Sequence, residues 1–483
     1  MHSDILVIGG GTCGCVVAAR LSERTDRTVV LLEAGPGYAE PPGPLLDMTA
    51  MPVGPLGRWA REYPAMLTQD RPGVSVRGRV LGGSSAVNGG YFVRATPADI
   101  DGWGEGWSFD DALPFFVASE HDLDYTDAYH GSSGPLPVQR VPDSQFTGLS
   151  AEFTRACLRA GFAECADKNG PDSDGVGRVP MNIADGRRVS TAEAYLLSAS
   201  ARGNPTVLTG RAVHALIVES GRAVGVEVRF GSTVERLFAE RIVLCCGAIE
   251  SPAVLMRSGI GDSAVLERVG VRTAVELPGV GRTLYDHPEV ALPFTASDSA
   301  ANAVAPLQVV LNTESVEIRP YTAPMDTLVP GSGMQTQYLG VGLMDSRSRG
   351  SVTLGSTDPE MLPMVDFSYL TERSDRERLR AGVQVAQELL GDLHAQGVLT
   401  YQHVDPTDAW LADHLGTSQH SVGTCAMGAV VDNGFAVHGV ENLYVVDTSV
   451  IPRNLSRGPN ATAVMLAERA AELLVQCTIR GPR

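Results

Sequence analysis

The feature that most constrains this chain lies at its start, where an apolar run over residues 4–8 leads into Gly9-x-Gly11-x-x-Gly14. A helical pattern follows, and a second apolar run ends at Glu33. Glycines at this spacing allow a tight turn and a close approach of the backbone to a pyrophosphate at a helix N-terminus. An acid about 20 residues further on holds the ribose hydroxyls. The sequence therefore predicts a βαβ unit that binds a dinucleotide, and this motif alone fits FAD and NAD equally.

Charge and hydropathy exclude several classes of function. The 483-residue chain carries a formal net charge of −18, whereas nucleic-acid binding depends on Lys and Arg side chains that neutralise phosphates. No apolar run reaches the length of about 18 residues expected of a membrane span, and no signal-peptide pattern precedes the first strand. We therefore expect no nucleic-acid partner, no transmembrane segment and no metal site. A reducing cytoplasm is expected, in which Cys13, Cys15, Cys245 and Cys246 serve as small hydrophobic residues.

Further elements are expected along the chain. Ser108 is a suitable N-cap for a helix over residues 110–120, whereas the Gly/Pro-rich residues 35–75 are expected to be irregular. Residues 213–246 are expected to form a β-meander with turns at Ser220-Gly221 and Gly231-Ser232. Additional helices are predicted at residues 151–160, 375–391 and 461–475, and additional strands at 28–32, 307–311, 335–341 and 351–354.

A second Gly/Ser-rich loop separates the two possible cofactors. Residues 78–88 read Gly-Arg-Val-Leu-Gly-Gly-Ser-Ser-Ala-Val-Asn, and no later GxGxxG turn follows a strand to hold a nicotinamide cofactor. Residues 78–101 resemble the first signature of the glucose–methanol–choline (GMC) oxidoreductase family, which uses FAD, and residues 247–261 resemble its second signature. Ordered matches continue through residues 130–136, 277–288, 348–359 and 420–425. The resemblance therefore covers nearly the whole chain.

This resemblance implies a fold class and a division into domains. The expected fold is α/β, with a Rossmann-type FAD-binding domain interleaved with an α+β substrate domain built on an antiparallel sheet. Residues 1–140, 203–288 and 421–483 are expected to form the FAD-binding domain. Residues 141–202 and 289–420 are expected to form the substrate-binding domain.

Two residues are expected to carry the chemistry. His420 occupies the position of the family's catalytic histidine, and Asn460 stands where the family has histidine or asparagine beside it. An imidazole with an ordinary pKa of about 6.5 suits removal of a hydroxyl proton while hydride leaves the alcohol carbon. The Asn460 amide would orient the substrate oxygen, and asparagine is also a favoured N-cap for the final helix. His130 and His287 lie in loops that the resemblance marks as structural.

The resemblance also marks a set of cofactor-binding residues. Asn88 and Gly89 would contact the flavin ring, Asp447 the ribitol, and Val213 the adenine side, although a strand valine facing the core is the alternative for Val213. Val87 stands where some choline-oxidising relatives carry a histidine bonded to the flavin, so FAD is expected to be non-covalent. The start of the last helix would stabilise the negative charge of the reduced flavin. The complete expected set is Gly9, Gly11, Thr12, Cys13, Gly14, Glu33, Ala34, Gly83, Ser84, Asn88, Gly89, Val213, Gly247, Asp447, Ala461 and Thr462.

These matches predict an FAD-dependent alcohol oxidoreductase. Residues 3–7 and 11–14, together with the short chain, resemble the branch associated with mycofactocin, a peptide-derived redox cofactor. That branch implies reduced mycofactocin as the alcohol substrate and a respiratory component as the electron acceptor, with oxygen or a quinone as the alternatives. It also implies a cytoplasmic protein at the inner face of the membrane. Three other activities stay open: an oxygen-using alcohol oxidase, a hydroxynitrile lyase on the same fold, and a non-catalytic flavoprotein.

Overall fold

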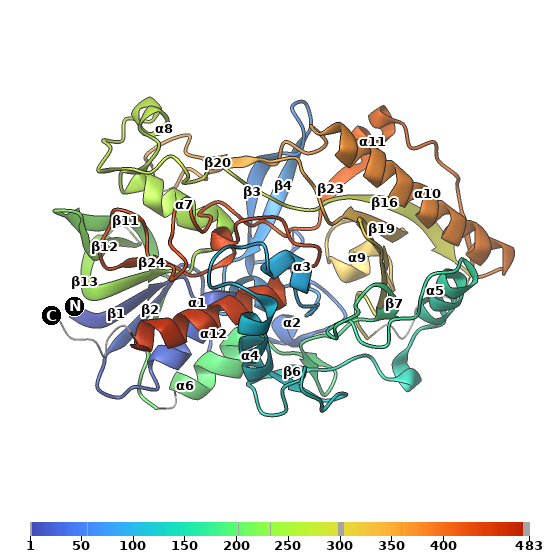
Figure 1. Ribbon diagram of the computed structural model, residues 1–483, viewed down its shortest axis with the longest axis horizontal. Coiled ribbons are helices and arrows are strands. Elements are labelled where there is room, and N and C mark those ends of the chain that lie inside the picture. The colour runs from blue at the N-terminus through green and yellow to red at the C-terminus, as the bar shows by residue number, and fades with distance from the viewer. Residues whose placement is uncertain are drawn as a thin grey trace.

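The computed structural model describes residues 2–55, 57–200, 202–231, 233–297, 304–358 and 360–476. One sheet contains the N-terminus and has the strand order β10-β2-β1-β13-β12-β11, with β24 paired to β13 (Figure 1). Its parallel strands are β1 (His2–Ile8), β2 (Val29–Glu33), β10 (Thr206–Thr209), the second half of β13 (Thr233–Leu244) and β24 (Leu443–Val445). The predicted βαβ unit is confirmed, because β1 and β2 pair in parallel on either side of α1 (Thr12–Leu21).

The predicted β-meander forms the other half of this sheet. Strands β11 (Ala212–Glu219), β12 (Arg222–Phe230) and β13 pair in antiparallel register. Ser220 and Gly221 both have positive φ angles, +51° and +80°, which is the backbone conformation of a tight hairpin turn. The second expected turn includes Ser232, which lies outside the described residues. β13 begins in the meander and ends in the parallel layer, so it carries the chain from the surface to the centre of the sheet.

Two helices far apart in the sequence cover this sheet together. Figure 1 shows α1 (blue) beside α12 (Asn460–Gln476, red). Both are lined with small and branched residues that are fully buried, as the apolar periodicity predicts. The Cys13 thiol lies in this interface and donates to the Ala463 carbonyl at 3.2 Å, so it packs as a small buried side chain.

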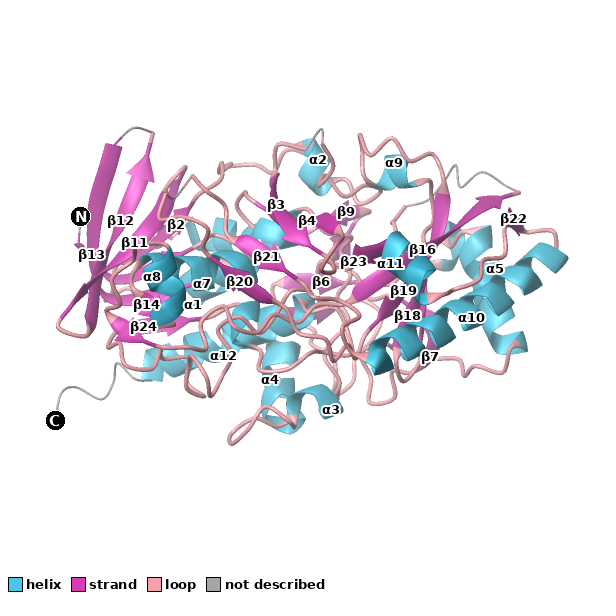
Figure 2. Cartoon of the chain, turned by 90° about the horizontal axis from the view of Figure 1, so that it is seen from above, coloured by secondary structure: helices cyan, strands magenta, loops and turns pink. Residues whose placement is uncertain are grey.

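A second large sheet lies at the other end of the molecule and is antiparallel throughout, as the resemblance implies. Figure 2 shows α10 (Arg373–Ala395) and α5 (Gly148–Arg159) packed against it. Its strands are β7 (Gly175–Arg178), β16 (Pro288–Ala296), β17 (Val309–Asn312), β18 (Val316–Pro320), β19 (Gln337–Leu343), β22 (Leu399–Tyr401) and β23 (Leu415–Thr417).

A four-stranded sheet lies between the two large sheets (Figure 2). It contains β3 (Ala60–Met66), β4 (Pro72–Gly78), β20 (Ser351–Thr353) and β21 (Met364–Asp366). The prediction that residues 35–75 are irregular is therefore wrong for their second half. Pro64 obscured the alternation in the sequence, yet it lies on the exposed side of β3, between buried Tyr63 and Ala65.

The predicted helices are confirmed with small shifts at their ends. α4 (Phe109–Ser119) begins after Ser108, whose hydroxyl accepts from the Asp111 N–H at 3.1 Å, as an N-cap should. α7 (Gly247–Arg257) directly follows β13. The remaining elements are α2 (Gly43–Leu46), η1 (Gly83–Ala86), α3 (Pro97–Ile100), β5 (Glu120–Asp122), β6 (Leu136–Val138), η2 (Asp143–Gln145), β8 (Ile183–Ala184), β9 (Arg187–Arg188), η3 (Ala192–Leu197), α6 (Ser198–Ser200), β14 (Ile260–Gly261), α8 (Ser263–Arg268), β15 (Val275–Glu276), α9 (Met325–Leu328), α11 (Asp408–His414) and η4 (Thr448–Val450).

Candidate active site

The glycines of the first loop are required by close packing at the end of β1. Gly9 has a φ angle of +97°, and a Cβ atom there would lie 2.6 Å from the Cys245 carbonyl oxygen. A Cβ atom at Gly14 would lie 1.8 Å from the Gly9 carbonyl oxygen, so any side chain would push α1 away from the strand. The loop between β1 and α1 therefore has the compact turn that the spacing predicts.

The second glycine loop packs directly against the first. The Gly82 N–H donates to the Gly10 carbonyl at 2.8 Å. A Cβ atom at Gly83, whose φ angle is +52°, would lie 2.6 Å from Gly11 Cα. The two motifs, which are about seventy residues apart in the sequence, therefore form one surface at the carboxyl ends of the parallel strands, where α/β sheets bind their ligands.

This surface has the open backbone positions and free donors that a dinucleotide needs. A Cβ atom at Gly11 would meet no atom nearer than 3.9 Å, and one at Gly247 would meet nothing within 4 Å. α1 has no side-chain hydrogen bond at its N-cap and no acidic residue in its first turn. The N–H groups and the positive end of its dipole are thus available to an anion. The donor set fits a pyrophosphate.

Two predicted cofactor contacts are buried carboxylates that hold the loops. Glu33 accepts from the N–H groups of Gly10 at 2.8 Å and Gly35 at 2.6 Å. Asp447 accepts from the Gly247 N–H at 2.9 Å and from the Ser251 hydroxyl at 2.6 Å. Burial raises the pKa of both carboxyl groups. Their expected contacts with ribose and ribitol stay predictions.

The other expected cofactor residues fall into two groups. Cys13, Gly14, Gly83, Ala461 and Thr462 are buried, and the Thr462 hydroxyl accepts from the Ala95 N–H at 3.3 Å. The half-buried group comprises Gly9, Gly11, Thr12, Ala34, Ser84, Asn88, Gly89, Val213 and Gly247. Val213 lies on β11 opposite Val228.

The backbone on both sides of His420 is tightly held. Its N–H donates to Asp286 Oδ1 at 2.8 Å. Arg77 donates to the Gln419 carbonyl and to the Ser421 hydroxyl, both at 2.6 Å. Gln419 itself has a φ angle of +64°, and its side-chain oxygen accepts from the Val76 N–H at 2.9 Å. A left-handed residue held by its neighbours in this way fixes the direction of the side chain that follows it.

The His420 ring lies against a second histidine. The Nδ1 atoms of His420 and His287 are 2.8 Å apart. Burial, followed by the charges of His287, Arg319 and Arg77, lowers the pKa of His420 well below its usual value. Because the ring is therefore neutral near pH 7, it is able to accept a proton.

His287, which the sequence interpretation marks as structural, lies inside the candidate site. Its ring is 1% exposed, with Nε2 lying 2.7 Å from the Leu455 carbonyl oxygen. The two histidines are 133 residues apart and meet because β16 pairs with β23, with Pro288 opposite Thr417. The residue before His287 also joins the two segments, since Asp286 Oδ1 accepts from the N–H groups of both His287 and His420.

Asn460 reaches the same region from the start of α12. The helix begins at Asn460 and the Ala463 N–H donates to the Pro459 carbonyl, so Pro459 is the N-cap and the capping interpretation of Asn460 is wrong. The Asn460 amide instead donates to the Tyr91 carbonyl and to Asn182 Oδ1, both at 3.2 Å. A Cβ atom two residues earlier, at Gly458, would lie 3.2 Å from the Tyr91 ring and 3.3 Å from His420 Cε1. The segment that carries Asn460 thus lies against the His420 ring.

His130 lies in a different environment, as the structural interpretation of its loop predicts. Its Nδ1 lies 3.0 Å from Asp122 and its Nε2 lies 3.0 Å from Asp167. Burial acts to lower its pKa, but the hydrogen bonds to Asp122 and Asp167 raise the pKa of His130 to about 11. Arg140 pairs with Asp122 in the same cluster. A protonated His130 therefore acts as one of the cations of a buried ion cluster.

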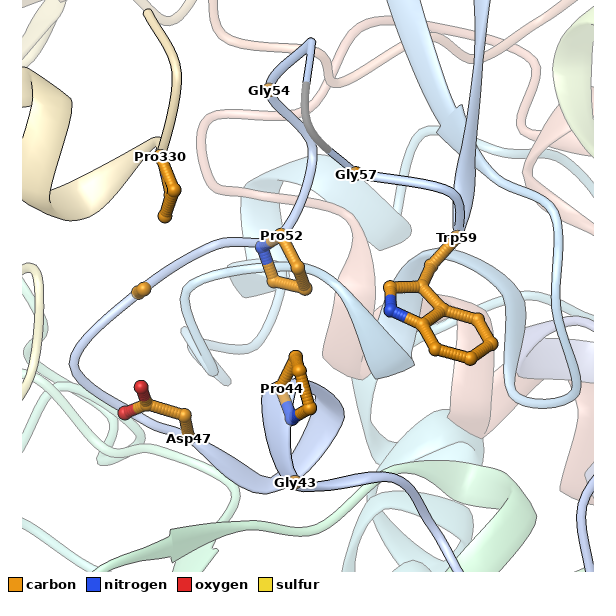
Figure 3. Close-up of a pocket in the computed structure, with 9 residues that line it drawn as sticks. Gly43, Pro44, Asp47, Pro52, Gly54, Gly57, Trp59 and Pro330 are labelled. Atoms are coloured by element: carbon orange, nitrogen blue, oxygen red, sulfur yellow. The ribbon is translucent and has the colours of Figure 1, made fainter.

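A surface pocket of about 400 Å³ opens between α2 and the turn after α9 (Figure 3). Pro44, Pro52, Trp59 and Pro330 give it an apolar lining, and Asp47 lies at one side. Trp59 also packs beneath the second glycine loop with Val80, Ala86 and Val87. The pocket therefore adjoins the support of that loop.

The structure has two glycine loops at the carboxyl ends of its parallel strands. It also brings a neutral histidine and an asparagine together beside an antiparallel sheet. These are features of a dinucleotide-dependent oxidoreductase. The chain belongs to the GMC oxidoreductase family, whose N-terminal part matches residues 3–289 and whose C-terminal part matches residues 346–467. The protein is accordingly an FAD-dependent oxidoreductase that acts on CH–OH groups.

Similar proteins extend over the whole chain. An uncharacterized GMC-type oxidoreductase in the thcA 5′ region of Rhodococcus erythropolis is 46% identical, with 98% of each chain covered. The oxygen-dependent choline dehydrogenase of Brucella anthropi is 32% identical over 98% of this chain and 95% of its own. The crystal structure of pyridoxine 4-oxidase from Mesorbium loti is 30% identical, with a TM-score of 0.91, and covers 99% of this chain and 100% of its own.

The FAD is bound non-covalently. Val87 is buried beside Trp59 and Val80, and its aliphatic side chain has no atom that can bond to a flavin. Among the described residues, no helix is both long enough and apolar enough to span a bilayer.

Proposed function

We propose that His420 is the general base of an alcohol oxidation and that Asn460 orients the substrate oxygen. The observation that carries this proposal is the His420 ring, which is kept neutral while the backbone on both sides of it is anchored. A group that must take up a proton works best when it is deprotonated before the reaction and fixed in direction. His420 meets both requirements.

Each residue of the candidate site has a separate role in this reaction. Bound FAD supplies the hydride acceptor. His420 takes the hydroxyl proton. Asn460 lies at the first turn of α12, two residues after Gly458, which packs beside the His420 ring, and it would contact the same substrate oxygen. The N-terminus of α12, at Ala461 and Thr462, would hold the flavin ring and stabilise the negative charge of the reduced cofactor with its positive dipole end.

The remaining expected contacts form one binding surface in this proposal. The phosphate loop Gly9–Gly14 holds the pyrophosphate, with Glu33 on the ribose and Asp447 on the ribitol. Residues 1–140, 203–288 and 421–483 build the FAD-binding domain, and residues 141–202 and 289–420 the substrate domain. The sheet of β16–β19 then forms one wall of the substrate site, which agrees with the place of His287 at the start of β16.

The substrate is a primary or secondary alcohol, and we propose reduced mycofactocin because residues 3–7 and 11–14 resemble that branch. Choline and pyridoxine are the alcohols to compare with it, since the names of two relatives point to them. A respiratory component is the proposed acceptor, which would place this protein in the cytoplasm at the inner face of the membrane.

Anaerobic titration of the yellow holoenzyme tests this function. Reduced mycofactocin, choline, pyridoxine and simple primary alcohols are added in turn, and the flavin absorbance is followed. Bleaching by at least one alcohol is expected, followed by reoxidation with a quinone analogue faster than with oxygen. Rapid reoxidation by oxygen would instead identify an alcohol oxidase. Turnover of a cyanohydrin without bleaching would identify a lyase, and a flavin that no alcohol reduces would contradict the proposed function.

A further inference from the structure

A backbone carbonyl decides where His287 carries its proton. His287 Nε2 lies 2.7 Å from the Leu455 carbonyl oxygen. Because a carbonyl oxygen only accepts hydrogen bonds, His287 Nε2 must carry hydrogen and donate it. The ring is 1% exposed, and burial lowers the pKa of His287. A neutral ring with hydrogen on Nε2 has a bare Nδ1, which can only accept.

The hydrogen bond between the two rings fixes the position of the proton on His420. His287 Nδ1 accepts, and it lies 2.8 Å from His420 Nδ1. His420 Nδ1 must therefore carry hydrogen and donate it, since two bare nitrogen atoms at this distance would repel each other. A neutral His420 with hydrogen on Nδ1 has a bare Nε2. Among the described residues no group is hydrogen-bonded to that Nε2 atom, and His420 is half-buried.

We propose that His287 is a positioning residue that holds His420 in the tautomer with hydrogen on Nδ1, so that Nε2 is the atom that receives the substrate proton. This inference rests on the proposed function of His420 as base. The arrangement needs no change during the reaction, because protonated His420 keeps its Nδ1 hydrogen and continues to donate to His287. Sequence reasoning missed this role because it depends on the Leu455 carbonyl, a backbone atom.

The charged groups around the pair are consistent with this assignment. Asp286 Oδ1 accepts from both backbone N–H groups and so holds the two residues together without bonding to either ring. The cations Arg319 and Arg77 disfavour a positive charge on His420. Arg319 also disfavours a positive charge on His287, where Asp286 and Glu317 act in the opposite direction but burial is the largest effect. Both rings therefore rest in the neutral form that the tautomer assignment requires.

Nitrogen NMR of the holoenzyme labelled with 15N-histidine tests the tautomer without measuring activity. The shift of a ring nitrogen distinguishes a protonated atom from a bare one, and the His420 signals are those missing from His420→Gln. The expected result for His420 is a protonated Nδ1 and a bare Nε2. A bare Nδ1 and a protonated Nε2 would overturn the inference. This measurement uses the native sequence, so it remains available if a variant fails to fold.

Kinetics of two His287 variants provide the second test. His287→Phe keeps a ring of similar size but removes the acceptor, and kcat for flavin reduction by the fastest alcohol of the panel should fall about 10²-fold with little change in KM. His287→Asn offers an amide oxygen near the position of Nδ1 and should recover most of that loss. His394→Phe is the matched control, since His394 also bonds to a carbonyl, that of Leu399, but on α10.

The outcomes separate this inference from the function on which it rests. Flavin reduction at the wild-type rate in a His420→Ala variant would contradict the proposed base whatever the tautomer. An inactive His420→Ala variant combined with unchanged kinetics in His287→Phe would overturn only the role of His287. Equal losses of kcat in His287→Phe and His287→Asn, with the NMR signals of His420 unchanged, would mean that His287 contributes only by packing. That result would also overturn its positioning role.

Discussion

His130 and His287 are both buried histidines in loops of the same kind, yet different groups face their ring nitrogens. Three carboxylates, those of Asp122, Asp167 and Glu120, lie within 3.3 Å of the His130 ring nitrogens, and they raise the pKa of His130 to about 11. A carbonyl oxygen and a second imidazole flank His287, and burial lowers the pKa of His287. The first ring is protonated near pH 7 and stabilises an ion cluster. The second ring is neutral and available to direct a neighbour's proton, so the partners of a buried histidine decide its role.

Removing the cationic histidine should have the largest effect on stability. His130→Gln leaves the buried Asp122 without one of its cations, and losing one partner of a buried ion pair costs about 3–5 kcal/mol. The free energy of unfolding, measured by chemical denaturation, should fall by that amount. His394→Gln, which loses a single half-buried hydrogen bond, is the control and should cost about 1 kcal/mol. Equal losses in the two variants would show that the His130 ring carries no charge in the folded protein.

Opposite pH dependences should distinguish the two histidines. The folded-state pKa of His130 is raised, so its contribution to stability is complete below pH 6.5 and is lost as the pH rises toward 11. The folded-state pKa of His287 is lowered, so its contribution is complete above pH 6.5 and is lost as the pH falls below that value.

Denaturation midpoints of the wild type, His130→Gln and His287→Phe at pH 5, 7 and 9 measure this contrast. The gap between the wild type and His130→Gln should shrink from pH 7 to pH 9. The gap between the wild type and His287→Phe should instead widen from pH 5 to pH 7. Parallel changes in the two gaps would mean that both rings are in the same protonation state.

A smaller effect is expected at the carboxylate that joins the two active-site histidines. Asp286→Asn keeps one oxygen for the two backbone N–H groups, and the hydroxyls of Thr417 and Ser421 can rotate to accept from the new amide. The kcat for flavin reduction should therefore fall less than about tenfold. Asp286→Ala removes all four bonds and should cost more. A loss of kcat in Asp286→Asn as large as that in His287→Phe would mean that the negative charge of Asp286, rather than its hydrogen-bonding geometry, holds the two histidines in their active arrangement.

Local spacing accounts for what could be predicted from the sequence. The turn at Gly9 and Gly14 depends on residues within one βαβ unit, and the meander turn at Ser220-Gly221 depends on two adjacent residues. The Ser108 cap likewise depends on an N–H three residues away. Such features need no knowledge of the rest of the fold, and all three were predicted.

The missed features depend on distant pairing. His287 meets His420 only through the β16–β23 register, and Asn460 finds its partners on Tyr91 and Asn182 rather than at its own helix terminus. β3 was missed because Pro64 hides its alternation, although Pro64 lies on the exposed side of the strand. The identity of His420 as the candidate base came from family resemblance, since ten histidines in the chain offer no local distinction.

Anaerobic stopped-flow reduction of the flavin in His420→Ala tests the central claim most directly. The wild type and the variant, both loaded with FAD and matched for flavin content, are mixed with the alcohol that bleaches the wild type fastest. The account predicts that the rate of flavin reduction falls about 10²-fold or more in the variant, because the base that removes the hydroxyl proton is gone. Reduction of the variant at the wild-type rate would contradict the account.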